Sequence, residues 1–275
     1  MTNTNQSNSN VPPQIPTQVT LTTGLWGGPG ENPEDRIPIK GVLAAVEAAL
    51  RQPTRVLFQL RQPRPSRLII LMLVCAVVSG AVYGFVVGTF SGGIQLWAAP
   101  VKIAIGLVLS ALICLPSLYI FACLSGSHAK PVEVIGSVTA ALMLMTILMI
   151  GFAPVAWVFS ESTESVVFMG ALHLLFWFVS ALFALRYVRL AIAHSGAHSL
   201  AGFVIWAVIF VVVALQMTTA LRPLVGTADT FLPTEKKFFL THWIDCVRAG
   251  ASIKNPAQSA SALPESQPAP VFSRK

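Results

Sequence analysis

The dominant feature of the sequence is a series of five long stretches that contain no Asp, Glu, Lys or Arg. Each stretch exceeds the roughly 20 residues that a helix needs to cross a bilayer. The chain of 275 residues is 54% hydrophobic and only 11% charged, whereas soluble domains carry about 25% charged residues. The sequence therefore predicts an all-α membrane protein with five transmembrane helices. The uncharged stretches are 68–101, 103–129, 134–160, 165–185 and 190–221.

Turn residues and flanking charges divide these stretches into individual spans. Prolines, glycines and short polar loops separate the apolar runs, and such residues favour turns. Together the runs form a transmembrane domain over residues 63–221. The predicted spans are 68–90, 102–124, 132–159, 166–185 and 200–221.

The two ends of the chain differ in composition from the apolar middle. Residues 1–38 and 251–275 are rich in Asn, Gln, Ser, Thr, Pro and Gly, a composition typical of disordered tails. Residues 1–38 also lack the pattern of a signal peptide, so we expect a non-cleaved cytosolic tail. Residues 222–250 contain an amphipathic segment with Phe238, Phe239 and Trp243. We expect this segment to rest on the outer face of the membrane.

Residues 39–62 precede the first span and show helical periodicity. Apolar residues recur at positions 39, 42, 43, 46 and 50, and Pro53 starts a second short run. Both runs are too short to cross a bilayer, and basic residues accompany them. The pattern predicts two amphipathic helices along the cytosolic interface of the membrane. A docking helix for a soluble partner remains the alternative.

The distribution of Lys and Arg around the spans predicts the orientation. Basic residues precede the first span and lie between spans two and three and between spans four and five. Since short cytoplasmic loops carry an excess of Lys and Arg, we expect a cytoplasmic N-terminus and an outside C-terminus in the inner (cytoplasmic) membrane. The net charge of +7 then reflects contact with lipid headgroups rather than nucleic acid. These basic residues are Arg51, Arg55, Arg61, Arg64, Arg67, Lys130, Arg186 and Arg189.

Small residues recur every four positions along one face of the first span. This spacing lets two helix backbones approach closely, which favours helix association in lipid. The second span carries a weaker version of the same pattern. We expect the two spans to pack together, although the face could also serve self-association with a second copy. The residues are Ala76, Gly80, Gly84 and Gly88 in span one, and Gly106 and Ser110 in span two.

His173 lies near the middle of the fourth predicted span, where an ionisable residue is a functional hypothesis by default. Its neighbours on the helix include Trp177 and Ser180 and direct it toward the bundle. A packed histidine with one hydrogen bond is the alternative. His194 and His198 are four residues apart, but two ligands do not make a metal site. Hydrolase, zinc-protease and phosphate-loop motifs do not occur, so we expect neither catalytic residues, a cofactor nor a metal.

Two segments carry a resemblance to a known family. SGAVYGFVVG (79–88) and GGIQLWAAPVKIAIG (92–106), within this five-span layout, resemble the Yip-domain family of polytopic membrane proteins. Gln95 and Ala99 stand where eukaryotic members have an acidic residue and a glycine, so the resemblance is to distant, bacterial members. It implies a non-enzymatic scaffold that organises an unknown partner on the cytosolic side. The alternative function is a small transporter or channel that uses the bundle interior around His173.

Overall fold

The computed structural model describes residues 28–91, 95–163 and 166–220. Within these ranges the fold is entirely helical. The predicted segments 222–250 and 251–275, and most of the predicted tail 1–38, lie outside the described residues. One short 3-10 turn, η1, and seven α-helices occur in the described ranges: η1 (Pro33–Arg36), α1 (Val42–Arg51), α2 (Pro53–Leu60), α3 (Ser66–Ser91), α4 (Gln95–Leu124), α5 (Pro131–Ser162), α6 (Val166–Ala193) and α7 (Ala201–Ala220).

Four helices of the described chain, α3 to α6, are long and apolar enough to cross a membrane. The prediction of an all-helical fold with apolar helices of membrane-spanning length is confirmed for these four helices. The fifth stretch forms α7, which is apolar over Ala201–Met217 but shorter than the other four. Its role as a fifth span stays a prediction.

Two helices extend beyond the predicted spans. The second span was expected to begin at residue 102, after Pro100, but α4 begins at Gln95 and includes Pro100. Proline inside a membrane helix is tolerated because neighbouring helices and local adjustments satisfy the freed backbone groups. Lys102 is consequently inside α4, and its side chain is buried. The fourth span was expected to end at residue 185, but α6 continues to Ala193.

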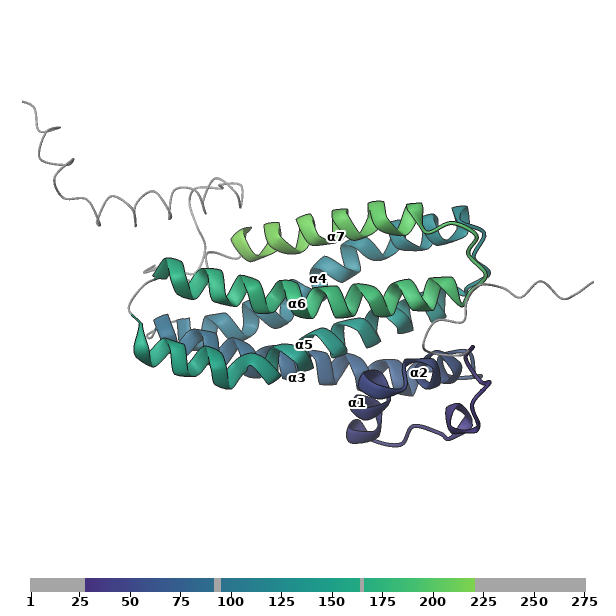
Figure 1. The fold of residues 1–275 in the computed structure, drawn as a ribbon, viewed down its shortest axis with the longest axis horizontal. Coiled ribbons are helices and arrows are strands. Elements are labelled where there is room, and N and C mark those ends of the chain that lie inside the picture. Colours follow the sequence, from purple (N-terminus) through teal and green to yellow (C-terminus); the bar gives the residue numbers. More distant parts are fainter. Residues whose placement is uncertain (1–27, 92–94, 164–165, 221–275) are drawn as a thin grey trace, which may run out of the picture.

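The helices pack as a bundle around α5 (Figure 1). α5 contacts α3, α4 and α6, and α4 also packs against α3 and α7. Met143, Met145 and Thr146 of α5 are almost completely buried at the centre. α7 is fixed to α4 by a hydrogen bond in which Trp206 Nε1 donates to the Cys114 carbonyl oxygen at 2.8 Å. α6 and α7 are consecutive in sequence, yet each packs against a different helix.

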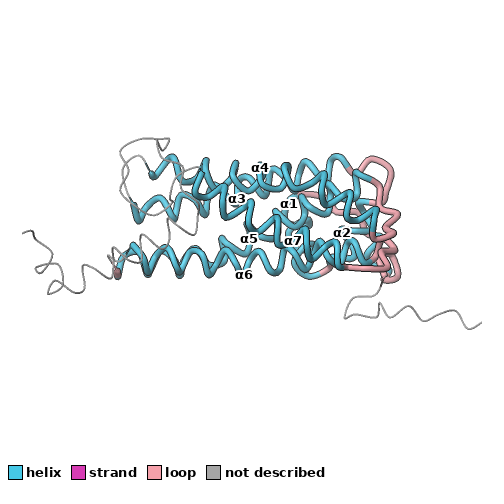
Figure 2. The backbone as a smooth tube through the Cα atoms, turned by 90° about the horizontal axis from the view of Figure 1, so that it is seen from above, coloured by secondary structure: helices cyan, strands magenta, loops and turns pink. Residues whose placement is uncertain are grey.

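One end of the bundle brings together the loops 125–130 and 194–200 with α2; we call this the basic end (Figure 2). The two loops are joined by backbone hydrogen bonds, from His128 N to Ser195 O and from His198 N to Ser125 O, both 2.9 Å. Arg61, directly after α2, donates to the His194 carbonyl oxygen at 2.8 Å and pairs with Glu133 at 3.9 Å. Basic residues from three separate parts of the chain lie at this end: Arg61 after α2, Lys130 in the loop before α5 and Arg189 in the last turns of α6.

Residues 28–62 fold into a compact unit on the side of the basic end, which we call the cap. Asp35 is only 2% exposed and accepts hydrogen bonds from the Gly30 backbone N–H and the Thr54 hydroxyl, at 2.9 and 3.1 Å. The expectation of a disordered tail up to residue 38 is wrong for residues 28–38. Composition misleads here because Thr54, the buried hydrogen-bond partner of Asp35, is 19 residues away in sequence.

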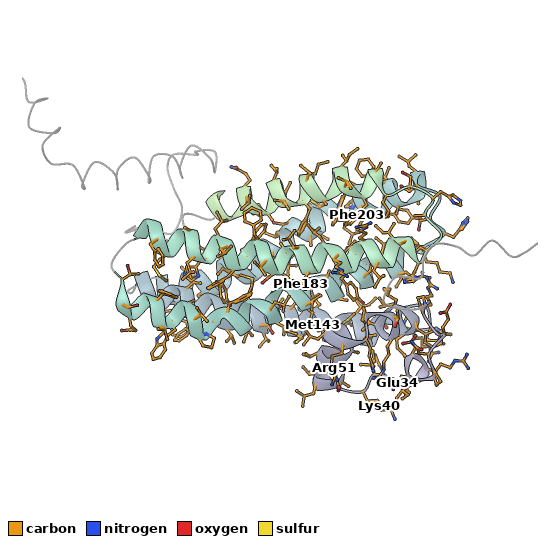
Figure 3. The ribbon with its side chains drawn as sticks, in the orientation of Figure 1. Glu34, Lys40, Arg51, Met143, Phe183 and Phe203 are labelled. Atoms are coloured by element: carbon orange, nitrogen blue, oxygen red, sulfur yellow. The ribbon has the colours of Figure 1, made fainter. Side chains whose placement is uncertain are left out.

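α1 turns its alanines toward the bundle and its larger apolar residues outward. Ala45, Ala48 and Ala49 are buried against the core, whereas Leu43 is 85% exposed. Val42 and Leu50 are exposed beside it. Of the periodic apolar residues that predict an amphipathic helix, Val42, Leu43 and Leu50 thus remain on the outer surface, and Ile39 and Val46 are partly buried against the core. Lys40 and Arg51 are exposed nearby (Figure 3).

Candidate functional site

The small-residue face of α3 lies against α4 of the same chain. A Cβ atom at Gly84 would lie 2.5 Å from Pro100 Cα and 2.9 Å from the Ala99 carbonyl oxygen. At Gly80 it would lie 3.5 Å from Ala104 Cα and 3.5 Å from Thr146 Cγ2. Only glycine permits the approach at Gly84, because the facing atoms belong to the backbone of α4. This face is therefore occupied within the described bundle.

The other members of the small-residue pattern are also buried. Ala76 and Gly88 of α3 are buried, as is Gly106 of α4. Ser110 is fully buried and donates its hydroxyl hydrogen bond to the Gly106 carbonyl oxygen at 2.7 Å. A buried serine that bonds to its own helix satisfies its hydroxyl locally. These residues pack helices and present no reactive group.

His173 of α6 contacts Tyr83 of α3. The Tyr83 hydroxyl and His173 Nδ1 are 2.9 Å apart, and the two rings meet edge to face with centroids 5.9 Å apart. Tyr83 is 1% exposed. Because α5 packs between α3 and α6, this contact spans the bundle and joins two helices that are otherwise apart. The other ring nitrogen, Nε2, is buried and has no hydrogen-bond partner among the described residues.

Three further buried polar atoms without a described partner follow His173 at intervals of seven residues. They are Ser180 Oγ, Tyr187 Oη and His194 Nε2. Seven residues are close to two full turns, so His173, Ser180 and Tyr187 lie on nearly the same side of α6, and His194 follows directly after the helix. We call this set the polar face of α6. It faces inward, since Ser180 and Tyr187 are buried.

The spacing of the polar face limits its chemistry. With a rise of about 1.5 Å per residue, successive groups are about 10 Å apart along the helix, too far for direct hydrogen bonds. A proton could move between them only through intervening groups. The face can bind or orient a polar species at one position, and His173 with Tyr83 is the position where two helices contribute.

His194 lies beyond the end of α6, at the basic end. Burial of its ring lowers the pKa of His194, the positive charge of Arg61 lowers it further, and Glu31 opposes the shift. The lowered pKa favours the neutral imidazole. His198 lies against Gly126 in the neighbouring loop, and within residues 28–91, 95–163 and 166–220 no three metal-binding side chains gather.

Sequence reasoning singled out His173 but not Tyr83, Tyr187 or His194 as its companions. Tyr83 is 90 positions away in sequence, and only the packing of α3, α5 and α6 brings it near. The seven-residue interval from His173 through Ser180 to His194 is a signal present in the sequence. It could have identified the polar face without the structure.

The chain matches no family model, no curated protein and no solved structure. Three features of its own fold bear on function. They are the cap on the basic end, the close contact of α3 with α4, and the polar face of α6 with its link to Tyr83.

Proposed function

We propose that this protein is a non-enzymatic, multi-pass membrane scaffold that organises a partner at the membrane through its cap. The observation that carries the proposal is the way the cap is built. The buried Asp35–Thr54 hydrogen bond stabilises the cap internally, and Arg61 joins the cap to the bundle through its ion pair with Glu133 and its hydrogen bond to the His194 carbonyl oxygen. A preorganised unit of this kind presents one surface to a partner, which lowers the cost of binding.

The outer surface of the cap has the composition of a docking face. Val42, Leu43 and Leu50 form an exposed apolar stripe on α1, and an amphipathic helix of this kind can bind a partner groove. Lys40 and Arg51 flank the stripe. The bundle interior supports a structural role, since Met72, Leu118 and Met143 fill it almost without exposure.

Site-specific crosslinking tests the scaffold proposal. A photoreactive amino acid at the exposed position Glu47 would be activated in intact membranes. We expect a discrete protein adduct that is lost in Leu43→Glu and retained in Leu124→Glu, a control at another exposed leucine of the basic end. Adducts with lipid alone would overturn the proposal and favour a purely interfacial α1. Equal adducts in both variants would also overturn it.

We also propose the finer topology: five spans in the inner membrane, with the cap in the cytoplasm and the C-terminal end outside. α7 has 20 residues and a length of about 30 Å, comparable to the hydrocarbon thickness. The gathering of Arg61, Lys130 and Arg189 around the basic end supports a cytoplasmic position for it. This layout agrees with the resemblance to Yip-domain proteins.

A small transporter or channel is the second candidate, favoured by the link between His173 and Tyr83. An unpartnered ring nitrogen inside a helix bundle is a typical element of an ion or solute path. In proteoliposomes with a pH-sensitive dye, transport predicts a proton flux that His173→Phe abolishes and Ser117→Ala, a control outside the polar face, leaves intact. Flux equal to that of protein-free liposomes would reject proton transport.

A further inference from the structure

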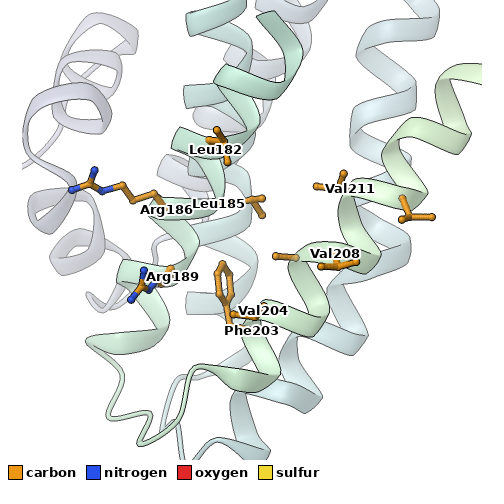
Figure 4. Close-up of a pocket in the computed structure, with 10 residues that line it drawn as sticks. Leu182, Leu185, Arg186, Arg189, Phe203, Val204, Val208 and Val211 are labelled. Atoms are coloured by element: carbon orange, nitrogen blue, oxygen red, sulfur yellow. The ribbon is translucent and has the colours of Figure 1, made fainter. Parts of the chain in front are cut away.

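A groove of 620 Å³ lies between α6 and α7 (Figure 4). It exists because α7 packs against α4 and α6 packs against α5, so the two consecutive helices diverge. Its volume is within the range of about 300 to 1,000 Å³ that is usual for small-molecule sites. The groove is lined by Leu182, Leu185, Arg186, Arg189, Phe203, Val204, Ala207, Val208, Val211 and Val212.

The walls of the groove are apolar and open to the surroundings of the bundle. Leu182 is 66% exposed and Val208 is 60% exposed, while Phe203 is buried beneath them. In a membrane-spanning bundle the surroundings of these residues are lipid. An acyl chain that enters the groove would cover both walls and complete the packing between the helices.

Two arginines, Arg186 and Arg189, line the groove on α6. They are three residues apart, a spacing that places them on the same side of a helix. Arg189 is four residues before the end of α6 at Ala193, or about 6 Å along the helix axis. Both are exposed, and neither forms an ion pair with a described residue. A planar guanidinium group can donate two parallel hydrogen bonds to two oxygens of one phosphate, which makes arginine well suited to binding phosphate.

The charges around this position favour an anion. Arg61 and Lys130 also lie at the basic end, and the one acidic residue that pairs with Arg61 there, Glu133, belongs to α5 rather than to the groove. The lining of the groove contains two cations and no acidic residue. The lining therefore combines apolar walls with two long cationic side chains on α6, of which Arg186 extends away from α7 in Figure 4 and has a flexible stem that can turn toward the groove.

We propose that the groove between α6 and α7 binds an anionic phospholipid, with one acyl chain between the helices and the phosphate on Arg186 and Arg189. A free phosphate would use the arginines but not the apolar walls. A helix from a second copy would use the walls but leave the arginines without an anion. Among these occupants, an anionic lipid matches both parts of the groove.

The test uses the full chain in nanodiscs that contain a trace of phosphatidylglycerol with a photoreactive acyl chain. We expect adducts on peptides of α6 and α7 within 182–212. Unlabelled phosphatidylglycerol should compete about tenfold better than phosphatidylcholine with the same acyl chains, and soluble glycerol phosphate should not compete. Equal competition by the two lipids would overturn the proposal, as would adducts confined to other helices.

Matched variants separate the two parts of the site. Arg186→Gln with Arg189→Gln should remove the preference for phosphatidylglycerol, whereas Arg64→Gln with Arg67→Gln, an equal loss of exposed charge outside the groove, should keep it. Val208→Trp should fill the groove and reduce adducts with either lipid, whereas Val78→Trp on α3 should not. Adducts that rise when residues 221–275 are removed, or that fall with self-association, would assign the groove to a protein segment instead.

Discussion

Gly84 determines how closely the C-terminal part of α3 can approach the N-terminal part of α4. Its missing Cβ atom leaves room for the backbone of α4 at Pro100. The same residue pattern in the sequence permits either an intramolecular contact or self-association. The spacing shows only that small residues lie on one face of the helix, and it does not identify the helix that packs against them. In the structure the contact at Gly84 is made with α4 of the same chain.

Gly84→Ala should destabilise the bundle. The added Cβ would lie 2.5 Å from Pro100 Cα, so α3 and α4 must separate, at a cost of about 1 to 3 kcal/mol. Gly151→Ala is the matched control, since a Cβ there meets nothing within 4 Å, and it should leave stability unchanged or raise it. Thermal unfolding in detergent measures both variants. Equal stability of the two would contradict the close approach.

Replacement by Phe should change the stability of the protein differently at the two buried tyrosines, Tyr83 of α3 and Tyr187 of the polar face of α6. Tyr83→Phe removes the bond to His173 Nδ1 and should cost about 0.6 kcal/mol and no more than about 1.7 kcal/mol, the mean and maximum measured for hydrogen bonds between membrane helices. Tyr187→Phe removes a buried hydroxyl without a described partner and should be neutral or stabilising. Chemical unfolding of both variants in mixed micelles tests this contrast, and a larger loss for Tyr187→Phe would refute it.

Among the elements, the apolar helices were the most predictable and the cap the least. Uncharged stretches directly indicate where a helix can cross lipid, because charge in hydrocarbon is costly. The ends of α4 and α6 were harder to place, since Pro100 and Arg186 interrupt the sequence pattern without interrupting the helix. The folding of residues 28–38 depends on contacts with α2, and these contacts cannot be predicted from the local composition of the segment.

Asp35→Ala should loosen the cap without unfolding the bundle. It leaves the buried Thr54 hydroxyl without its partner, at a cost of about 1 to 3 kcal/mol. Glu34→Ala is the control, since Glu34 is exposed and its bond to Gln52 is at the surface. Hydrogen exchange should be faster in residues 28–62 for Asp35→Ala alone. Exchange that accelerates throughout α3 to α6 would show that the cap and bundle unfold together.

The basic end should weaken as the pH falls. The pKa of His194 is lowered from its usual 6.5, chiefly by burial, so the opened state binds a proton more readily than the folded state. The stability present above about pH 6.5 is lost progressively below it. Hydrogen exchange in residues 194–200, corrected for its intrinsic pH dependence, measures the effect. His194→Gln should abolish it, and an unchanged pH profile in that variant would assign the effect to another group.

On the scale of the whole molecule, the two ends of the bundle differ, because the cap gathers at one end only (Figure 1). The cap and the loops 125–130 and 194–200 gather at the basic end, and α7 runs from this end toward the other (Figure 1). An odd number of crossings would place the two ends of the chain on opposite sides of the membrane. The scaffold proposal itself requires that the cap face the compartment that holds its partner, and the side of the N-terminal end reports this.

The most direct measurement is the sidedness of the two termini. Single cysteines at Ser7 and Ser273, in a variant without the four native cysteines, would be labelled in inverted and right-side-out vesicles with a membrane-impermeant reagent. The account predicts that Ser7→Cys reacts only from the cytoplasmic side and Ser273→Cys only from the outside. Labelling of both from the same side would contradict five crossings, and labelling of Ser7→Cys from the outside would contradict the proposed orientation of the cap.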